Sequence, residues 1–429
     1  MKNNFCQYNK PIFTSLSPNT QKDDIILALK LIFQPWKWKK VEPVLILEKK
    51  FREYLNIKHA FAFNSGRSAF TAILNALEMD AFAEATVGKE ILLQAFTCNA
   101  TVNPIIKTGL KPVFVDIDKE TLNIDIFDLE KKISDQSKIV LVQHTFGMPA
   151  NMDRVMGICQ KHNLILIEDC AHSLGATYNE KKLGTFGTAA FFSFGRDKVI
   201  SSVFGGMATT NDEDLARKIG EYRDKLAKPS CFWTFQQLLH PILNNLLVIP
   251  LYGFFGTGKW FLIFLQKIGL LSKAVKNEEK QGKMSDNSAK KMPNKLALLA
   301  LNQFNKLEKV LKNQKEIASF YQENLKNPDF ILPNQDPKRI YMRYSLLLKD
   351  KDTDKILKKA RKQKIFLDDG WRKTVIVPPD TNQEKMGYRA GDCPVAEKVA
   401  ENILNLPTHI NISKEEAKRI TDFLNKDGN

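Results

Sequence analysis

The chain has 429 residues, 43% of them hydrophobic, which is enough for two or three domains with large cores and unlike a disordered protein. Its formal net charge is +16, but the basic residues are spread along the chain without interleaved aromatics, which argues against nucleic-acid binding. The six cysteines show no CxxC spacing, so we expect neither a metal site nor a disulfide framework. The N-terminus lacks the apolar stretch of a signal peptide, which favours a cytoplasmic protein.

The first part of the chain predicts an N-terminal arm and helix, over 1–60, followed by an α/β domain over 61–228. Residues 44–60 have the spacing of an amphipathic helix. Six short apolar runs then alternate with helical stretches, at 60–63, 91–96, 112–117, 139–144, 164–169 and 189–194. Such runs predict strands buried on both faces of a mostly parallel sheet, whose ligands bind outside the carboxyl ends of the strands.

An apolar and basic insert is expected over 229–291, because 229–258 contains no Asp, Glu, Lys or Arg. Three interpretations are open. A membrane-spanning helix over 238–255 is long enough, but prolines and asparagines interrupt it. The second is a buried hairpin at a subunit interface. The third is a hairpin over 232–271 that lies in the membrane headgroup region, with tryptophans and flanking lysines as anchors.

The stretch Gly253–Lys259 matches the GxxxxGK pattern of a phosphate-binding P-loop. However, Trp260 stands where that motif needs Ser or Thr to hold Mg²⁺, and the flanks are apolar. We interpret the match as a coincidence. The last part of the chain, 292–429, is expected to hold one long amphipathic helix over 294–326 and a smaller α+β domain over 340–425.

Three segments that follow predicted strands carry the residue types of a pyridoxal 5'-phosphate (PLP) site. A Gly-containing turn at 64–69 opens a helix, which is a seat for phosphate. Asp169 ends a buried strand, where a carboxylate can pair with a pyridinium nitrogen. Lys198 follows another strand, and a lysine delivered to such a crevice can form an imine with an aldehyde. Each of these three signals alone is weak. The prediction rests on their joint occurrence, in the order phosphate turn, carboxylate and lysine.

The sequence resembles the DegT/DnrJ/EryC1/StrS family of PLP-dependent sugar aminotransferases. The matching stretches include LNIKHAFAFNSGRSAF, IEDCAHSLGATYNEKKLGTFGTAAFFSFGRDK and CPVAEKVAENILNLPTH. The resemblance implies a fold type I α/β architecture, with a mostly parallel sheet in a large PLP-binding domain and a smaller C-terminal α+β domain.

The resemblance also implies a role for each matching residue. Lys198 is the lysine that holds the cofactor and later moves the proton, and Asp169 holds the pyridine nitrogen. His172 lies near the phenolic oxygen of the ring. Ser193 binds the phosphate, together with the backbone around Gly66, Arg67 and Ser68. Related members that dehydrate sugars have His in place of the lysine, so Lys198 favours transamination.

Three departures from the family pattern concern the substrate more than the cofactor. Cys98 stands where the family has an aromatic residue stacked on the ring, and Arg67 replaces a small residue in the phosphate turn. The segment of the family that reaches into the partner subunit's site is here Ala289-Lys290-Lys291-Met292, in which Lys291 can replace an arginine.

The resemblance implies a homodimer that transfers an amino group from glutamate to a keto-sugar carried by a nucleotide, for surface glycan or amino-sugar biosynthesis. Two alternatives remain open. One is a catalytically lapsed, membrane-attached family member that acts as a binding or scaffold protein. The other is a different PLP reaction on the same fold. The basic charge and the insert also suit peripheral contact with the inner face of the membrane through 232–271.

Overall fold

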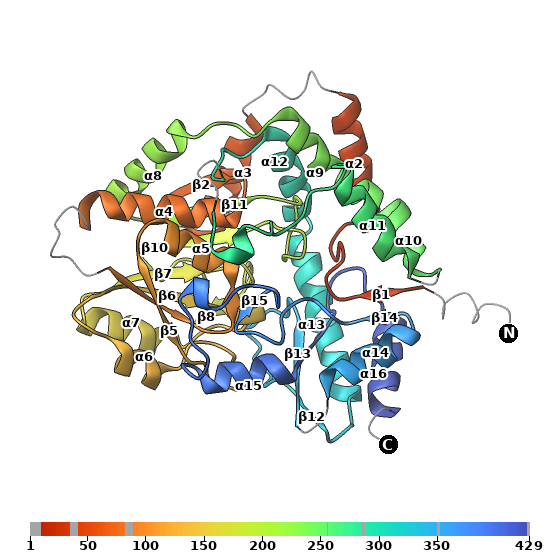
Figure 1. The fold of residues 1–429 in the computed structure, drawn as a ribbon. Helices are drawn as coiled ribbons and strands as arrows, with labels where there is room; N and C mark the ends of the chain where they lie inside the picture. The colour runs from red at the N-terminus through yellow and green to blue at the C-terminus, as the bar shows by residue number, and fades with distance from the viewer. Residues whose placement is uncertain are drawn as a thin grey trace.

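The protein, described by a computed structural model over residues 10–34, 42–81, 89–254, 256–284, 288–349 and 352–426, is built around one seven-stranded sheet (Figure 1). Its strand order is β2-β11-β10-β7-β6-β3-β5. The strands are β2 (His59–Phe63), β3 (Glu90–Gln94), β5 (Lys111–Val115), β6 (Ser137–Gln143), β7 (Ile165–Asp169), β10 (Ala189–Ser193) and β11 (Gly206–Thr210).

The sheet confirms the predicted fold class. Each of the six apolar runs forms a strand, and of the seven strands only β11 runs antiparallel to its neighbours, β10 and β2. The strands carry continuous buried aliphatic residues because helices cover both faces of the sheet. Figure 1 shows the strands between α4 (Gly66–Ala81) and α8 (Glu213–Lys225) on one side and α6 (Ile126–Lys132) and α7 (Met152–Lys161) on the other.

The helix predicted over 44–60 is shorter than expected. It is α3 (Glu42–Leu55), and the last residues of the predicted range belong to a turn and to β2. Asn56 has a φ of 55°, and the amide of Ile57 donates to the carbonyl of Arg52 at 3.1 Å. A residue in this left-handed conformation commonly ends a helix, and it is usually a glycine. Because the residue here is an asparagine, the end of the helix was difficult to predict from the sequence.

The single long helix predicted over 294–326 is wrong. Two helices occupy the range, α12 (Asn294–Phe304) and α13 (Leu307–Asn324), and Lys306 interrupts them with φ −102° and ψ 2°. The ammonium of Lys306 lies 2.8 Å from Asp23 and 2.9 Å from Asp24, both on α2 (Lys22–Phe33). The apolar spacing continues across the break, which is why the pattern did not predict it.

The C-terminal part has a second apolar core of its own. A three-stranded antiparallel sheet joins β12 (Phe330–Ile331), β13 (Tyr344–Leu348) and β16 (Ile403–Leu406). The end of α13, α14 (Thr353–Lys362) and α16 (Lys414–Lys426) pack on it, burying residues such as Tyr321 and Ile420. In contrast, α15 (Pro394–Asn402) joins the core of the large sheet through Ala396 and Val399.

The insert forms a helical hairpin beside the N-terminal helix. A helical run made of α9 (Cys231–Leu243), a π-helical turn η3 (Asn244–Val248) and α10 (Ile249–Tyr252) is followed by α11 (Thr257–Lys267). In Figure 1, α9 lies along α2, and these two helices are in contact. Among the residues that the structure describes, no helix is both long and apolar enough to cross a membrane.

The hairpin also accounts for the GxxxxGK match. The helix α10 leads directly into the motif, where a P-loop would have a strand, so it is not a P-loop. Gly258 sits where a Cβ atom would lie 2.3 Å from the ring of Tyr252 and 2.5 Å from the carbonyl of Val248. The glycine therefore permits close packing of α11 on the preceding helical run.

A cluster of phenylalanines packs α3 against the sheet, and its removal should destabilise the fold. The ring of Phe51 is fully buried, with ring centroids 5.6 Å from Phe192, 5.3 Å from Phe194 and 5.0 Å from Phe304. We expect Phe51→Ala to lower the free energy of unfolding by about 3–5 kcal/mol, measured by urea denaturation. The control Phe127→Ala removes a ring that is 78% exposed on α6 and should leave the midpoint nearly unchanged. Equal midpoints for the two variants would contradict this packing.

Candidate active site

A cavity of about 330 Å³ lies at the carboxyl ends of the strands, and seven parts of the chain line it. They are the N-terminal arm, the turn after β2, the start of α5 (Asn99–Lys107) with Cys98, the loop after β10, the end of the insert, and two stretches of the C-terminal part. Among the lining residues are Gly66, Arg67, Cys98, Arg196, Asp197, Lys198, Ala274, Asp369 and Trp371. Its size is within the range of small-molecule and cofactor sites.

The turn after β2 and the end of β10 form one tight corner of the cavity. A Cβ atom on Gly66 would lie 2.9 Å from Cβ of Ser193, and one on Gly206 would lie 2.3 Å from the amide nitrogen of Gly66. Only glycine fits at Gly206, because backbone atoms of the turn fill the space of a side chain. The corner therefore places Ser193 next to the first turn of α4, whose amide groups have no partners within the helix. This is the geometry of a phosphate seat.

Ser68, the third residue predicted for this turn, has a structural role in the described conformation. Its hydroxyl donates to Asn64 at 2.7 Å and lies 2.8 Å from the hydroxyl of Ser65, while its amide donates to Ser65 at 3.1 Å. Asn64 in turn accepts from the amide of Lys290. These hydrogen bonds fix the conformation of the turn. Ser68 therefore supports the candidate phosphate site and is not among the residues that line the cavity.

Arg67 lies in the cavity wall and forms an ion pair with Glu279 of the insert. The two side chains are only 14% and 10% exposed. Burial holds the pKa of Arg67 below its usual value, but the group stays a cation at neutral pH. Its Nε atom is buried without a hydrogen-bond partner among the described residues. The predicted phosphate turn therefore carries a fixed cation with one donor still free.

Lys198 projects into the same cavity from the loop after β10. Its Nζ atom lies 4.0 Å from a carboxylate oxygen of Asp197, and its side chain is 16% exposed. Asn19 in the N-terminal arm donates to the carbonyls of Lys198 and Val199 at 2.6 and 3.0 Å. These bonds fix the loop that carries the lysine. Asn19 is a positioning residue that no sequence pattern indicated, because it lies far away in the chain.

The carboxylate beside Lys198 belongs to a buried network that reaches into the C-terminal part. Arg343, which is 1% exposed, lies 3.5 Å from Asp197 and 3.2 Å from Asp369. Burial acts to raise the pKa of Asp197, but the charges of Lys198 and Arg343 outweigh it and hold that pKa below its usual value. Asp197 therefore remains an anion next to Lys198. This network was also missed, since Arg343 has no distinctive sequence context.

Asp169 lies at the end of β7, buried behind the cavity lining. It accepts from the amide of Ala171 at 2.9 Å and from the hydroxyl of Thr101 at 3.2 Å. Burial raises the pKa of Asp169, although the hydrogen bond from Ala171 and the charge of Lys198 oppose that shift. The ionised form of such a buried carboxylate is stabilised by a cationic partner such as a protonated ring nitrogen.

His172 is buried within an aromatic group next to Asp169. Its ring stacks on Phe146 with centroids 5.4 Å apart and meets Trp371 edge-on at 4.8 Å. The amide of Phe146 donates to Nδ1 of His172 at 3.4 Å, so that nitrogen is unprotonated. Burial holds the pKa of His172 well below its usual value, as do the charges of Lys198 and Arg343. The imidazole is therefore neutral at physiological pH.

The two remaining departures from the family pattern lie in different places. Cys98 lines the cavity and caps α5 (Asn99–Lys107) by accepting from the amide of Ala100 at 3.4 Å. Lys291 instead donates to the carbonyl of Asp224 at 2.9 Å, and its backbone pairs with Phe63. Two aromatic residues line this cavity, Phe204 from the loop after β10 and Trp371 from the C-terminal part.

Glu168, next to Asp169, organises the chain behind the site. It accepts from the backbone amides of Gly184, Phe186 and Gly187 and from His144. Cys170 lies close enough to complete a group of three potential metal-binding atoms with Glu168 and His144. The backbone bonds already use both carboxylate oxygens, so we interpret the group as structural.

The end of the insert is also part of the cavity wall. Arg196 donates to the carbonyl and the hydroxyl of Ser272, both at 2.8 Å, and stacks over Phe204. Ala274 lines the cavity itself. Asn103 donates to the carbonyl of Glu279 at 2.9 Å. The insert therefore closes one side of the site, which its apolar composition did not predict.

A pH experiment can test the buried, neutral state of His172. Its pKa in the folded state is well below the value of about 6.5 expected in the unfolded chain, so the unfolded chain binds the extra proton as the pH falls. The contribution of the neutral His172 to the free energy of unfolding is therefore fully present above pH 6.5 and is lost as the pH falls. We expect His172→Gln to reduce the slope of unfolding free energy between pH 6.5 and 5 by up to about 1.4 kcal/mol per pH unit. An unchanged slope in urea titrations would show that His172 titrates normally.

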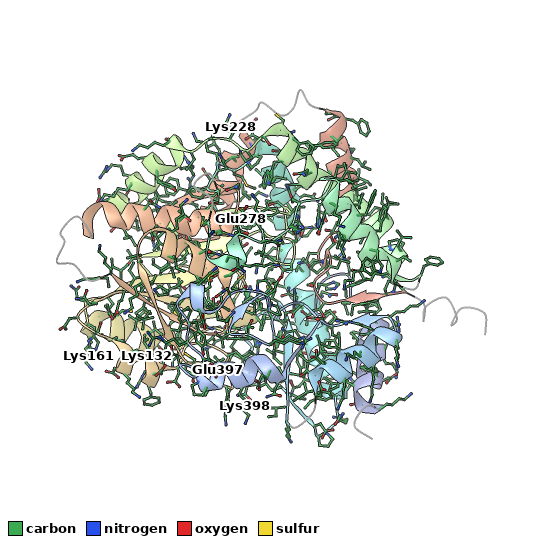
Figure 2. The ribbon with its side chains drawn as sticks, viewed as in Figure 1. Lys132, Lys161, Lys228, Glu278, Glu397 and Lys398 are labelled. Atoms are coloured by element: carbon green, nitrogen blue, oxygen red, sulfur yellow. The ribbon has the colours of Figure 1, made fainter. Side chains whose placement is uncertain are left out.

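The ion pair between Arg67 and Glu279 can be tested by removing its anion. We expect Glu279→Gln to lower the free energy of unfolding by about 3–5 kcal/mol, because it leaves a buried cation unpaired. Inorganic phosphate should raise the melting temperature of this variant more than that of the wild type. Glu278→Gln is the matched control, since Glu278 is exposed on the same loop (Figure 2). If the two variants melt alike, the pair does not stabilise the site.

Comparison with known proteins identifies the family. A family model described as the DegT/DnrJ/EryC1/StrS aminotransferase family matches residues 19–237 and 262–425. The unmatched stretch, 238–261, is part of the helical hairpin.

Among curated proteins, the chain is 29% identical over 392 residues to an uncharacterized protein of Methanocaldococcus jannaschii, covering 89% of each chain. It is 26% identical to dTDP-3-amino-3,6-dideoxy-alpha-D-galactopyranose transaminase of Aneurinibacillus thermoaerophilus, again covering 89% of each. It is 37% identical over 187 residues to GDP-perosamine synthase of Caulobacter vibrioides, covering 44% of this chain and 49% of that protein.

Solved structures share the fold over nearly the whole chain. PseC of Helicobacter pylori, an aminotransferase, superposes with a TM-score of 0.74 at 23% identity, covering 97% of this chain and 98% of that one. GDP-4-keto-6-deoxy-D-mannose-3-dehydratase of E. coli with bound hydrated PLP also gives 0.74, at 22% identity, covering 96% and 100%. From the family match over most of its length, the chain belongs to the DegT/DnrJ/EryC1/StrS aminotransferase family.

Proposed function

We propose that this protein is a PLP-dependent transaminase that transfers an amino group from glutamate to a keto-sugar carried by a nucleotide. The observation that carries the proposal is the position of Lys198, whose ammonium group enters a cavity that also contains the turn around Gly66. Relatives named GDP-perosamine synthase and dTDP-amino-sugar transaminase support the sugar class. We also propose that this reaction serves glycan or amino-sugar biosynthesis and takes place in the cytoplasm.

The residues around the cavity fit PLP. The free Nε donor of Arg67 and the hydroxyl of Ser193 lie where the resemblance expects the phosphate, next to the N-terminus of α4. Asp169 offers a buried carboxylate for the ring nitrogen, and the neutral His172 packs against Trp371, which lines the cavity. When bound, PLP supplies an electron sink that acidifies the carbon atom bearing the transferred amino group.

The side chains around the cavity would each have a separate role in the reaction. Lys198 Nζ would take the proton from that carbon and return it to the acceptor carbon, which requires a lysine that can lose its proton. Asp197, kept anionic by Arg343, balances the charge on Lys198 between these transfers. Asp169 would hold the proton on the ring nitrogen. Trp371 and the end of the insert reduce the access of water to the site.

The substrates and the assembly are inferred from the family alone. We propose a homodimer in which Lys291 and its neighbours reach the partner's site, as the corresponding family segment does. The domain limits at 61–228, 229–291 and 292–429 are likewise a proposal. The separate apolar cores of the large sheet and the C-terminal sheet support a division into domains, although α9, α12 and α15 also contribute to the core of the large sheet.

An amino-transfer assay tests the proposed reaction. The protein, reconstituted with PLP, should convert glutamate to 2-oxoglutarate and aminate a GDP- or dTDP-linked keto-sugar, detected by mass spectrometry. Lys198→Arg should reduce the rate by roughly 10²–10⁴-fold, the usual contribution of a general acid–base group. Lys228→Arg is the control, because this exposed lysine lies at the outer edge of the molecule (Figure 2).

The other outcomes of this assay identify the alternatives. Bound PLP without transfer from any amino donor would indicate a different PLP reaction on this fold. A protein that does not take up PLP at all would favour the scaffold interpretation.

A further inference from the structure

The outer side of the helical hairpin exposes large apolar side chains in a row. Trp260 and Phe264 of α11 and Ile268, the residue that follows this helix, are 72%, 53% and 51% exposed. They are four residues apart, so they lie on one face of the helix. The opposite face carries Gly258 and Leu265, which are buried. Helices of globular proteins normally turn such residues inward, so this face of α11 has no partner within the described chain.

A second exposed row lies on the preceding helical run. Leu246 and Phe254 are 55% and 68% exposed, and Pro250, halfway between them, is also exposed. Val248, a buried residue on this run, shares one apolar cluster with Leu265 of α11. Because the inner sides of the two helices meet in that cluster, the two rows both face away from it.

The apolar cluster also shows which way the hairpin faces. Leu16 of the N-terminal arm packs into it, and Tyr252 packs edge-on against Phe13 and Phe366, with centroids 4.9 and 5.1 Å apart. The inner side of the hairpin therefore rests on the body of the protein. The two rows form its outer surface, which we call the hairpin face (Leu246, Pro250, Phe254, Trp260, Phe264 and Ile268).

The charged side chains of the insert itself, up to Asn277, have one sign. From Leu226 to Asn277 the sequence contains no Asp or Glu. Lys259, Lys267, Lys273 and Lys276 are exposed, and none of them forms an ion pair with another residue that the structure describes. Lys267 is seven residues from Trp260 and so shares its face of α11. Apolar and aromatic side chains suit the acyl-chain boundary of a membrane, and neighbouring lysines suit its anionic headgroups.

We propose that the hairpin face docks on an anionic lipid bilayer, with α11 lying in the headgroup region. The apolar rows would enter the boundary of the acyl chains while the four lysines contact anionic headgroups. This docking is independent of the proposed reaction. It would hold the protein at the inner face of the membrane. Only three residues separate Ile268 from Ser272, to which Arg196 of the cavity wall donates, so the docked helix leads directly into the site.

A second copy of the chain is a less favourable partner for this face. In a two-fold interface the same patch meets itself, so the lysines around it would face one another without carboxylates to pair with. Like charges placed across an interface cost several kcal/mol. The centre of a protein interface is also usually depleted in lysine. The same cations favour binding to an anionic bilayer.

Vesicle co-sedimentation of the full chain tests the proposal. The protein should bind vesicles of phosphatidylcholine mixed with phosphatidylglycerol, and binding should weaken with salt and be much weaker to phosphatidylcholine alone. The triple variant Trp260→Ser, Phe264→Ser, Ile268→Ser should lose at least about tenfold in affinity, because it removes the buried apolar area. Phe127→Ser is the matched control, since that ring is 78% exposed on α6, outside the hairpin.

The lysines are tested separately with Lys259→Gln, Lys267→Gln. At about 1 kcal/mol for each lysine near an anionic surface, this double variant should bind mixed vesicles roughly 30-fold more weakly. Unchanged melting temperatures would show that both variants remain folded. The proposal is overturned if the wild type does not bind mixed vesicles, or if the triple variant binds them as the wild type does. Absence of vesicle binding combined with a lower molar mass of the triple variant would show that the face joins two subunits.

Discussion

The polarity of the parallel sheet is the constraint on which the site depends. Strands β2, β7 and β10 all end at the same edge, where they deliver the turn around Gly66, Asp169 and the loop of Lys198. The antiparallel β11 begins at that edge with Gly206, which fills the space between the turn and Ser193. Three segments that are distant in sequence thus meet because the chain direction of their strands requires it.

Two of the buried charges at this edge, Asp197 and Arg67, are each paired with a residue from another part of the chain. Arg343 from the C-terminal part stabilises Asp197, and Glu279 from the insert stabilises Arg67. A buried ion without its partner would cost several kcal/mol. The pairs therefore connect the large sheet to the C-terminal part and to the insert, and all three must be folded before the cavity is complete.

The sequence predicted what depends on local pattern. Continuous apolar runs indicated the strands, and the order of turn, carboxylate and lysine indicated the candidate site. It did not predict contacts between distant segments, such as the support of Lys198 by Asn19 or the pairing of Arg343 with Asp369. The break at Lys306 was missed for the same reason, since its cause is a pair of carboxylates on another helix. The departures from the family pattern were visible in the sequence, but only the structure placed Cys98 in the cavity wall and paired Arg67 with the insert.

The identity of the cofactor lysine is the point on which the proposed function depends most. Reduction of the PLP-treated protein with borohydride, followed by peptide mapping, measures it directly. We expect loss of the visible absorption band and a pyridoxyl group attached to Lys198. Attachment to another lysine, or no attachment in a folded protein, would contradict the assignment of Lys198 and the transaminase mechanism built on it.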